Sequence, residues 1–203
     1  MAESYTARFL GEVCAIPGLL DTAKIDEMTA LLAEVRENGG RIFFIGVGGG
    51  AGHASHAVND FRKIANIECY APSDNVSELT ARINDDGWES CYANWLRGSR
   101  LCAQDAVFVF SVGGGDRERK ISTNIVSSLE LAQRVGARIL GVVGPNGGYT
   151  AEAADVCITI PVDSADMVTP LVEAFQAIVW HLVVSHPRLK ANEMKWEAEA
   201  ALA

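Results

Sequence analysis

The sequence lacks the features that would direct the chain into a membrane or a secretory route. No segment holds 18 consecutive apolar residues, and the N-terminal stretch has no basic region followed by an apolar run. The five cysteines form no CxxC pair, and their odd number does not suit a set of disulfides. We therefore expect a cytoplasmic protein with free thiols and no membrane partner.

Charged residues make up only 21% of the chain, and their balance is acidic, with a net charge of −9. An acidic surface disfavours nucleic acids and anionic membranes as partners. A phosphorylated small molecule remains compatible with it, because backbone amides can attract a phosphate locally. With 203 residues, 49% of them hydrophobic, the chain can form one folded domain over 1–203.

Strand-like and helix-like segments alternate along the chain. Apolar runs at 41–47, 106–111, 137–144 and 155–161 are typical of buried strands, and a shorter strand is expected at 67–71. Helices are expected at 3–15, 22–38, 50–65, 88–101, 122–135 and 168–184, and residues 72–87 are expected to be a loop with one helical turn. The alternation predicts an α/β fold, a five-stranded parallel sheet flanked by helices. Residues 1–40 would form a helical extension that packs on the domain or on a partner subunit.

Two of the expected strands end in glycine clusters, GVGGG at 46–50 and SVGGG at 111–115. Ligands of open parallel sheets bind beyond the carboxyl ends of the strands. Glycine lets the backbone approach a phosphate closely, with the start of a helix behind it. Two such turns after two strands favour an anion-binding edge over tight turns without a ligand.

The first cluster also supports a different interpretation. Gly46, Gly48 and Ala51, with Glu68 downstream, imitate a dinucleotide-binding pattern and would indicate an oxidoreductase. That fold has no need for the second glycine cluster or for the histidines that follow the first, so it ranks below the alternatives given next.

Ligand-type side chains occur in two of the expected helices, the one after the first glycine cluster (50–65) and the last one (168–184). His56 and Asp60 are four residues apart and share one face of their helix, as a surface pair also would. Glu173 and His181 lie in the apolar run LVEAFQAIVWHLVV, where an unpartnered carboxylate is costly. Two imidazoles and two carboxylates are a plausible donor set for a divalent metal.

These residues resemble a known family. GVGGGAGHASHAVND at 46–60, SVGGG at 111–115 and the pair Glu173 and His181 are similar to the sedoheptulose 7-phosphate isomerases (phosphoheptose isomerases), which are built on a flavodoxin-like sugar-isomerase (SIS) domain. The resemblance implies an aldose–ketose isomerase that converts sedoheptulose 7-phosphate, assembles as a homotetramer and has its sites at subunit interfaces. It also implies a divalent metal, zinc as first choice, at His56, Asp60, Glu173 and His181, and either Asp60 as base and His181 as acid or the reverse.

The family also binds its substrate through two serine-containing turns. The positions that the resemblance assigns to substrate and phosphate are Gly48, Gly49, Gly50, Asp85, Ser111, Gly113, Gly114 and Ser122. Glycine stands at positions 50 and 113, where the family has serine, and the loop 113–121 is longer than the family's. Arg117 and Lys120 in this loop are candidates to replace the lost hydroxyl groups. The metal set also departs from the family, with Asp60 for a Glu and Glu173 for a Gln.

A non-catalytic role stays open at this point. SIS domains also serve as sugar-phosphate sensors and as adaptors that bind a replication initiator, and the missing serines suit such a role. The metal discriminates between the two, since a sensor or adaptor has no need for four ligand-type residues.

Overall fold

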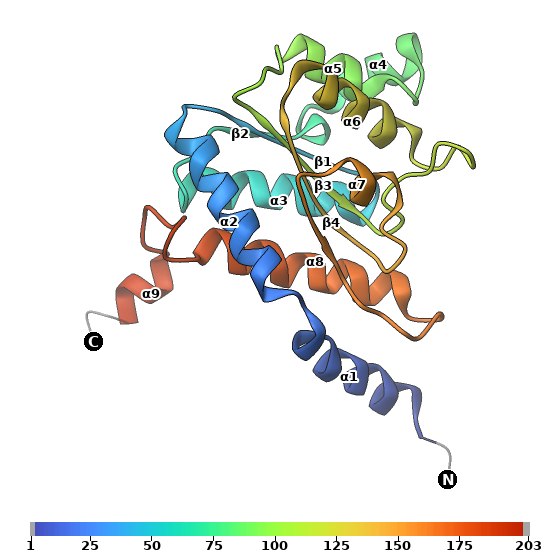
Figure 1. The fold of residues 1–203 in the computed structure, drawn as a ribbon, viewed down its shortest axis with the longest axis vertical. Helices are drawn as coiled ribbons and strands as arrows, with labels where there is room; N and C mark the ends of the chain where they lie inside the picture. The colour runs from blue at the N-terminus through green and yellow to red at the C-terminus, as the bar shows by residue number, and fades with distance from the viewer. Residues whose placement is uncertain (1–2, 201–203) are drawn as a thin grey trace.

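The computed structural model describes residues 3–200 and forms a parallel sheet covered by helices on both faces (Figure 1). The strands are β1 (Ile42–Gly46), β2 (Cys69–Tyr70), β3 (Ala106–Ser111), β4 (Arg138–Val143) and β5 (Val156–Thr159). Their order is β2-β1-β3-β4-β5, and every neighbouring pair is parallel. This order is that of flavodoxin-like folds, so the predicted five-stranded parallel sheet is confirmed.

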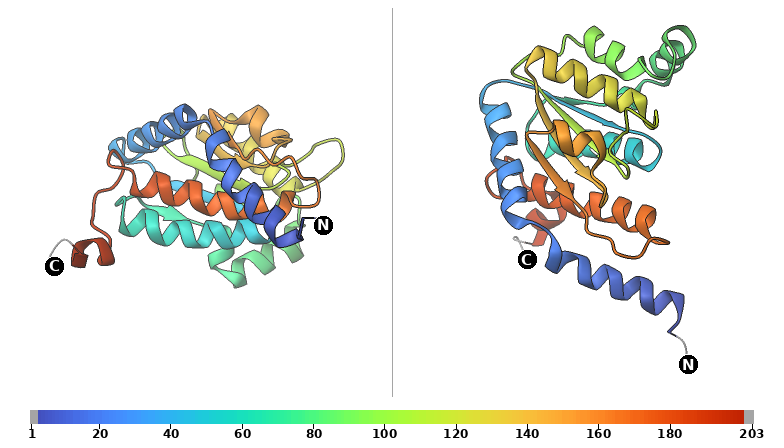
Figure 2. Two further views of the ribbon diagram at one scale, coloured as in Figure 1. Left: turned by 90° about the horizontal axis from the view of Figure 1, so that it is seen from below. Right: turned by 45° about the vertical axis from the view of Figure 1, so that its right-hand side comes forward.

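The helices divide between the two faces of the sheet. One face is covered by α2 (Thr22–Glu37), α3 (Gly49–Lys63) and α8 (Val168–Ser185), whose apolar side chains share one core with the strands. The other is covered by α5 (Cys91–Gly98), α6 (Thr123–Val135) and α7 (Gly148–Ala153). Figure 2 shows the two layers from below and from the side. A core on each face explains why the strands are continuously apolar rather than alternating.

The N-terminal helix α1 (Tyr5–Ala15) projects away from this body, and none of its residues is buried (Figures 1 and 2). A short 3₁₀ helix, η1 (Ile16–Leu19), joins it to α2. Arg8 pairs with Asp166 and Glu12 accepts a hydrogen bond from Ser164, so polar contacts to the segment before α8 hold it in place. At the other end of the chain, α9 (Lys195–Ala200) follows α8.

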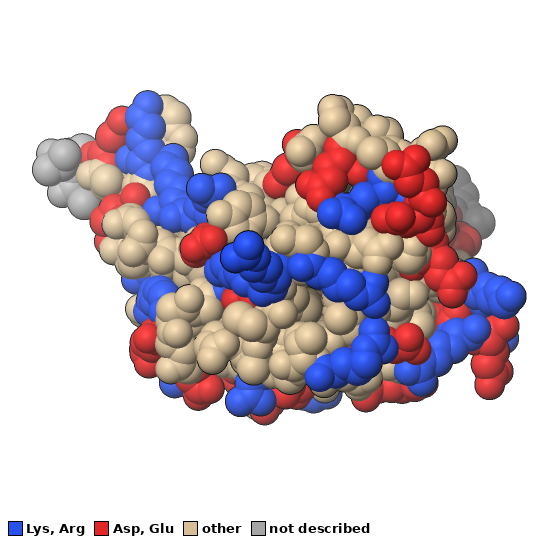
Figure 3. Space-filling model, turned by 90° about the horizontal axis from the view of Figure 1, so that it is seen from above, with Lys and Arg blue, Asp and Glu red and all other residues tan. Residues whose placement is uncertain are grey.

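Helix α8 is long and apolar enough, by length and composition, to cross a membrane. In this fold it packs on the sheet instead, with Phe175, Val179 and Trp180 in the core. The apolar side chains of α8 thus contribute to the core of the domain. The surface is uneven in charge, since Lys and Arg side chains gather in a band across the face that Figure 3 shows, in spite of the acidic total.

The segment before α5 differs from the sequence expectation. Residues 76–86, expected to be part of a loop, form the helix α4 (Val76–Asp86) after a 3₁₀ turn, η2 (Pro72–Asp74). Asn75 caps α4, its side-chain oxygen accepting from the Glu78 amide, and Glu78 pairs with Arg82 one turn on. Asn followed three residues later by Glu is a helix-start pattern, and that signal could have identified this helix.

The start of the sheet is fixed by an ion pair between β1 and the turn before β3. Asp105, 1% exposed, accepts from the Arg41 guanidinium at 2.7 and 3.1 Å and from the amides of Arg41 and Cys102. Burial opposes the charge of Asp105, but these hydrogen bonds outweigh it, so the pKa of this carboxyl is held below its usual value. The pair therefore aligns β1 with β3 while remaining ionised.

We expect Asp105→Ala to destabilise the protein by about 3–5 kcal/mol, because it leaves a partly buried guanidinium and two amides unpaired. Asp166→Ala, which removes the exposed partner of Arg8, should cost less than about 1 kcal/mol. Chemical denaturation of both variants measures the difference. Equal losses would show that the Arg41–Asp105 pair does not fix the sheet. Because the pKa of Asp105 is lowered on folding, its stabilisation is present above the unfolded pKa and is lost as the pH falls through the folded one.

Candidate active site

Two neighbouring helices on one face of the sheet carry the four residues that the sequence analysis assigned to a metal. Helices α3 and α8 lie side by side (Figure 1). Gly49, at the start of α3, faces Glu173 in the first half of α8, and Asp60, near the end of α3, faces His181 in the second half. The two helices therefore run in the same direction, with a line of polar groups between them.

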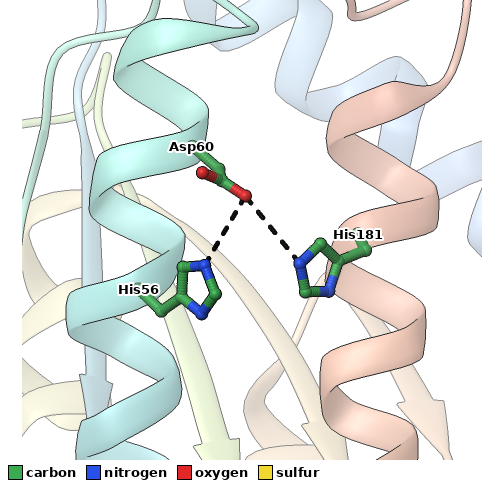
Figure 4. Close-up of side chains that lie close together, drawn as sticks. All are labelled: His56, Asp60 and His181. Atoms are coloured by element: carbon green, nitrogen blue, oxygen red, sulfur yellow. Dashed lines mark ion pairs between the residues drawn. The ribbon is translucent and has the colours of Figure 1, made fainter. Parts of the chain in front are cut away.

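His56, Asp60 and His181 converge at the far end of this line (Figure 4). The Asp60 Oδ2 lies 3.9 Å from His56 Nε2 and 3.8 Å from His181 Nε2. One ligand atom from each residue lies within 4.8 Å of the other two. Both imidazoles are about half exposed, whereas the Asp60 side chain is 16% exposed. A carboxylate is thus held between two imidazoles that solvent can reach.

Hydrogen bonds orient two members of this cluster. His181 Nδ1 lies 2.7 Å from the Ala177 carbonyl oxygen, which can only accept, so Nδ1 carries the proton. The neutral ring then presents a free lone pair on Nε2 toward Asp60. Asn59 donates to the other oxygen of Asp60 at 2.7 Å and leaves Oδ2 facing the histidines. Both groups are preset to bind a cation or to exchange a proton.

Glu173 does not join the cluster in its own chain. Eight residues separate it from His181, which is about 12 Å along a helix. Its carboxylate lies instead over Gly49, where a Cβ would approach it to 2.5 Å. His53, one turn further along α3, is close to Glu173: burial lowers the pKa of His53, although the charge of Glu173 acts in the opposite direction. Of the four residues assigned to a metal from the sequence, the structure brings together three.

The first glycine turn is shaped by a close approach of α3 to β3. Gly48 has a φ of +59°, which favours glycine, and a Cβ on Gly50 would lie 2.3 Å from the Phe110 carbonyl oxygen. Tyr92 donates from its hydroxyl to the Gly46 carbonyl at 2.8 Å, and burial raises the pKa of Tyr92 to about 12, which keeps that proton in place. Helix α3 begins without a side-chain cap, and the amides of Gly50, Ala51 and Gly52 donate to the carbonyls of Val47 and Gly48 in the turn before it.

The second glycine turn packs against another turn. A Cβ on Gly114 would lie 1.9 Å from the Gly147 carbonyl oxygen, and the Gly114 and Gly115 carbonyls accept from the first amides of α7. The Ser111 hydroxyl accepts from the Gly114 amide at 3.0 Å. Gly113 alone among these glycines has open space around its Cβ position. Glycines 114 and 115 therefore serve backbone packing, a reason that the sequence pattern did not give.

The loop 113–121 leads into α6 through a strained backbone. Asp116 and Ile121 form an isolated antiparallel bridge, and Lys120 and Ser122 both have positive φ, at 55° and 50°. Ser122 stands at the start of α6 without a hydrogen bond from its side chain to the helix. Arg117 turns back onto Glu130 and Tyr149, whereas Lys120 is exposed. Asp85, also assigned to the substrate from the sequence, is exposed on α4 and accepts from Asn84 at 2.8 Å.

Known proteins resemble this chain in sequence. No family model matches the chain. A lincomycin biosynthesis protein of Streptomyces lincolnensis is 32% identical over 167 residues, which cover 77% of this chain and 59% of that protein. A phosphoheptose isomerase of Geotalea daltonii is 30% identical over 165 residues, which cover 79% of this chain and 80% of the relative. The chain belongs to the phosphoheptose isomerase family. The prediction of an isomerase of this family is thereby confirmed.

The fold agrees as well. The structure of a phosphoheptose isomerase from Neisseria gonorrhoeae superimposes with a TM-score of 0.76 at 20% identity, over 89% of this chain and 92% of that one. The chain spans about three fifths of the Streptomyces relative, so part of that longer protein has no counterpart here.

At positions 50 and 113, where the resemblance predicts serine, this chain has glycine, and the surroundings of the two glycines differ. At position 50 the Phe110 carbonyl leaves no room for a side chain, since backbone atoms of a central strand cannot move aside. At position 113 the space is open. Glycine is thus required at position 50 by the way α3 packs on β3, whereas position 113 has space for a larger residue such as serine.

We expect Gly50→Ser to destabilise the protein by about 2–3 kcal/mol, because the added Cβ overlaps a strand carbonyl. Gly113→Ser should change the free energy of unfolding by less than about 0.5 kcal/mol, as an exposed substitution without a clash does. Thermal and chemical denaturation of the two variants, which introduce the same side chain, measure the contrast. A stable Gly50→Ser protein would mean that α3 lies further from β3 than described.

Proposed function

We propose that this protein is an aldose–ketose isomerase of a sugar phosphate, with sedoheptulose 7-phosphate as substrate and D-glycero-D-manno-heptose 7-phosphate as product. The observation that carries the proposal is the cluster of His56, Asp60 and His181 between α3 and α8, in a chain of the phosphoheptose isomerase family. A sensor or adaptor would bind its ligand without these acid–base groups.

Isomerisation moves one proton between neighbouring carbons of the open-chain sugar. A base removes the proton from the carbon beside the carbonyl, which gives an enediolate, and an acid returns a proton to the former carbonyl carbon. The hydroxyl proton on the first carbon passes to the former carbonyl oxygen, so that the first carbon becomes the new carbonyl. Asp60 and His181 are the two groups for these steps. His181 can accept or return a proton at Nε2, because Nδ1 is committed to the Ala177 carbonyl. Asp60 can do so at Oδ2, because Asn59 holds Oδ1.

The cluster also suits a divalent metal, with zinc as first choice. Two imidazole nitrogens and a carboxylate oxygen within 4.8 Å of one another are a donor set that such an ion accepts. His56, Asp60 and His181 would hold it, and the ion would polarise the substrate carbonyl and stabilise the enediolate. Because a donor atom bound to the ion cannot also carry a proton, Asp60 Oδ2 or His181 Nε2 would have to leave the ion before it took part in the proton transfer. The proton bound to the Ala177 carbonyl would fix the orientation of the His181 ring in the complex. Glu173 would contribute a fourth ligand only if a neighbouring subunit supplied it.

The phosphate would bind at the edge of the sheet where α3 and α6 begin. Both helices start without a side-chain cap, after Gly48 and after Ser122 respectively. Their positive dipole ends, with the amides of Gly49 and Thr123 at the first helical positions, would bind a phosphate in the absence of the family's serines. The Ser122 hydroxyl makes no hydrogen bond to the helix and remains available to a ligand.

Exposed apolar side chains support assembly into a homotetramer. Tyr5, Leu10 and Leu19 in the N-terminal helices are 56–61% exposed, and Ile178 and Leu182 on the outer side of α8 are 42–46% exposed. Within its own chain α1 packs only its partly buried Phe9 and Val13 on the core, and a second copy could cover its exposed apolar side chains. We propose the cytoplasm as the compartment of this assembly.

His181→Ala should lower kcat for sedoheptulose 7-phosphate isomerisation by about a hundredfold or more, since it removes an acid–base group. It should also reduce the bound metal measured by elemental analysis. His186→Ala is the matched control, because His186 ends the same helix but pairs with Asp26 outside the cluster. The control should keep its activity and metal within about twofold. Wild-type protein that binds the sugar phosphate without turnover would instead support the sensor role.

Light scattering at micromolar concentration should give a mass of four chains, and of at least two. Leu10→Glu combined with Leu19→Glu should shift the mass toward the single chain, because two charges would be buried in the contact. A wild-type protein that is monomeric under these conditions would contradict the proposed assembly.

A further inference from the structure

We propose that Arg117 is a positioning residue, which fixes the loop 113–121 onto α6 and α7 and thereby orients the first amides of α6 for the substrate phosphate. The inference rests on the proposed function, because it concerns the phosphate end of the same site. It assigns Arg117 a role that needs no contact with the phosphate.

The guanidinium of Arg117 is held on its edge and on its face. Its Nε and Nη2 lie 3.1 and 3.0 Å from the Glu130 Oε1 on α6, and its Nη2 also donates to the Tyr149 hydroxyl on α7. Its central carbon lies 3.8 Å from the centre of the Tyr149 ring, within the range of a cation–π contact. We call these contacts the Arg117 clamp, made of Arg117, Glu130 and Tyr149.

The residue under the guanidinium is itself rigid. Tyr149 is 6% exposed, its amide donates to the Gly115 carbonyl at 2.8 Å, and its hydroxyl donates to Gln133 on α6 at 3.1 Å. The clamp therefore joins the loop to two helices through a buried side chain. Glu130 carries the opposite charge beside Arg117, so the pair as a whole is neutral.

The loop needs such a fastening because its backbone is strained. Lys120 and Ser122 adopt left-handed conformations that cost non-glycine residues roughly 1 kcal/mol or more each. The Asp116 side chain accepts from the amides of Glu118 and Arg119, and the Asp116–Ile121 bridge closes the turn at 2.9 and 3.1 Å. These local bonds hold residues 116–121 together. The loop is tied to α7 at its start, where the Gly114 and Gly115 carbonyls accept from the Thr150 and Tyr149 amides, and the clamp adds side-chain contacts from Arg117 to α6 and α7.

The strained end of the turn leads directly into α6. Ser122 has the second positive φ and is also the residue from which α6 starts. If the loop were free, Ser122 could return to a relaxed backbone conformation, and the first amides of α6 would change direction. The clamp thus holds the backbone at Ser122 in the conformation that directs the first amides of α6 toward an anion at this helix start.

A double-mutant cycle tests the clamp against direct phosphate binding. We expect Arg117→Ala to weaken the binding of inorganic phosphate, measured by calorimetry, about tenfold, or about 1.4 kcal/mol, and to raise KM for sedoheptulose 7-phosphate with kcat nearly unchanged. Tyr149→Phe should weaken binding less, and the double variant should be no weaker than Arg117→Ala, because the two residues act as one unit. Arg117→Lys, which keeps the charge without the planar fork, should not restore binding.

Arg119→Ala is the matched control, since it removes the same charge from an exposed position two residues away, 3.8 Å from Asp116. It should keep phosphate affinity within about twofold. Full rescue by Arg117→Lys, or additive effects of Arg117→Ala and Tyr149→Phe, would overturn the inference in favour of a direct charge effect.

Amide hydrogen exchange without ligand gives an independent readout. Exchange at residues 116–123 should be faster in Arg117→Ala than in the wild type, and unchanged exchange would overturn the clamp itself. If Arg117→Ala binds phosphate as tightly as the wild type does, the inference about Arg117 is wrong, whereas the proposed function is unaffected. Wild-type protein that binds neither phosphate nor sugar phosphate would overturn the proposed function and this inference with it.

Discussion

The contact between the first turn of α3 and the end of β3 determines the geometry of everything on that face of the sheet. A Cβ on Gly50 would lie 2.3 Å from the Phe110 carbonyl oxygen, and a Cβ on Gly46 would lie 2.4 Å from the Gly50 carbonyl, so neither position has space for a side chain. Because nothing separates helix from strand there, α3 lies directly on the sheet, and Phe61 of α3 reaches Phe44 in the core at 5.0 Å between ring centres. The height and rotation of α3 are then fixed. A side chain at position 50 would move them, as well as every functional residue that α3 carries.

The position of α3 in turn determines which of its side chains lie opposite those of α8. With the apolar side of each helix in the core, the remaining sides form a shared line that starts at Gly49 and Glu173 and ends at Asp60 and His181. Its two ends differ in chemistry: the start of α3 offers amides and a positive dipole end, and the far end offers acid–base groups and metal donors. The eleven residue steps along α3 from Gly49 to Asp60 separate these two ends by about 16 Å. A sugar phosphate that places its phosphate at one end would extend its carbon chain toward the other.

The sequence was sufficient to predict whatever depends on local pattern. Uninterrupted apolar runs predicted the strands, and the spacing of His56 and Asp60 predicted that both would share a helix face. The meeting of His181 with that pair could be expected only through the family resemblance, because it depends on how two distant helices pack. The packing of Gly114 on Gly147 and the stacking of Arg117 on Tyr149 are also long-range contacts, which no local pattern encodes. Helix α4 is a different case, since Asn75 followed by Glu78 is a local helix-start pattern, yet the sequence expectation for this segment was a loop with one helical turn.

In the proposed phosphate site, the glycine turns would transfer anion binding from side chains to the backbone. Hydroxyl groups can rotate to follow a ligand, whereas amides can bind only if the backbone that carries them is held in one conformation. Where serines are absent, rigidity must come from elsewhere, and this chain supplies it at both turns: through Gly50 against Phe110 at the first, and through the interlocked turns at Gly114 and Gly147 at the second. The loop 113–121 has no such backbone packing beyond Gly115. A side chain that fastens it, as Arg117 does to Glu130 and Tyr149, is therefore the third part of the same arrangement.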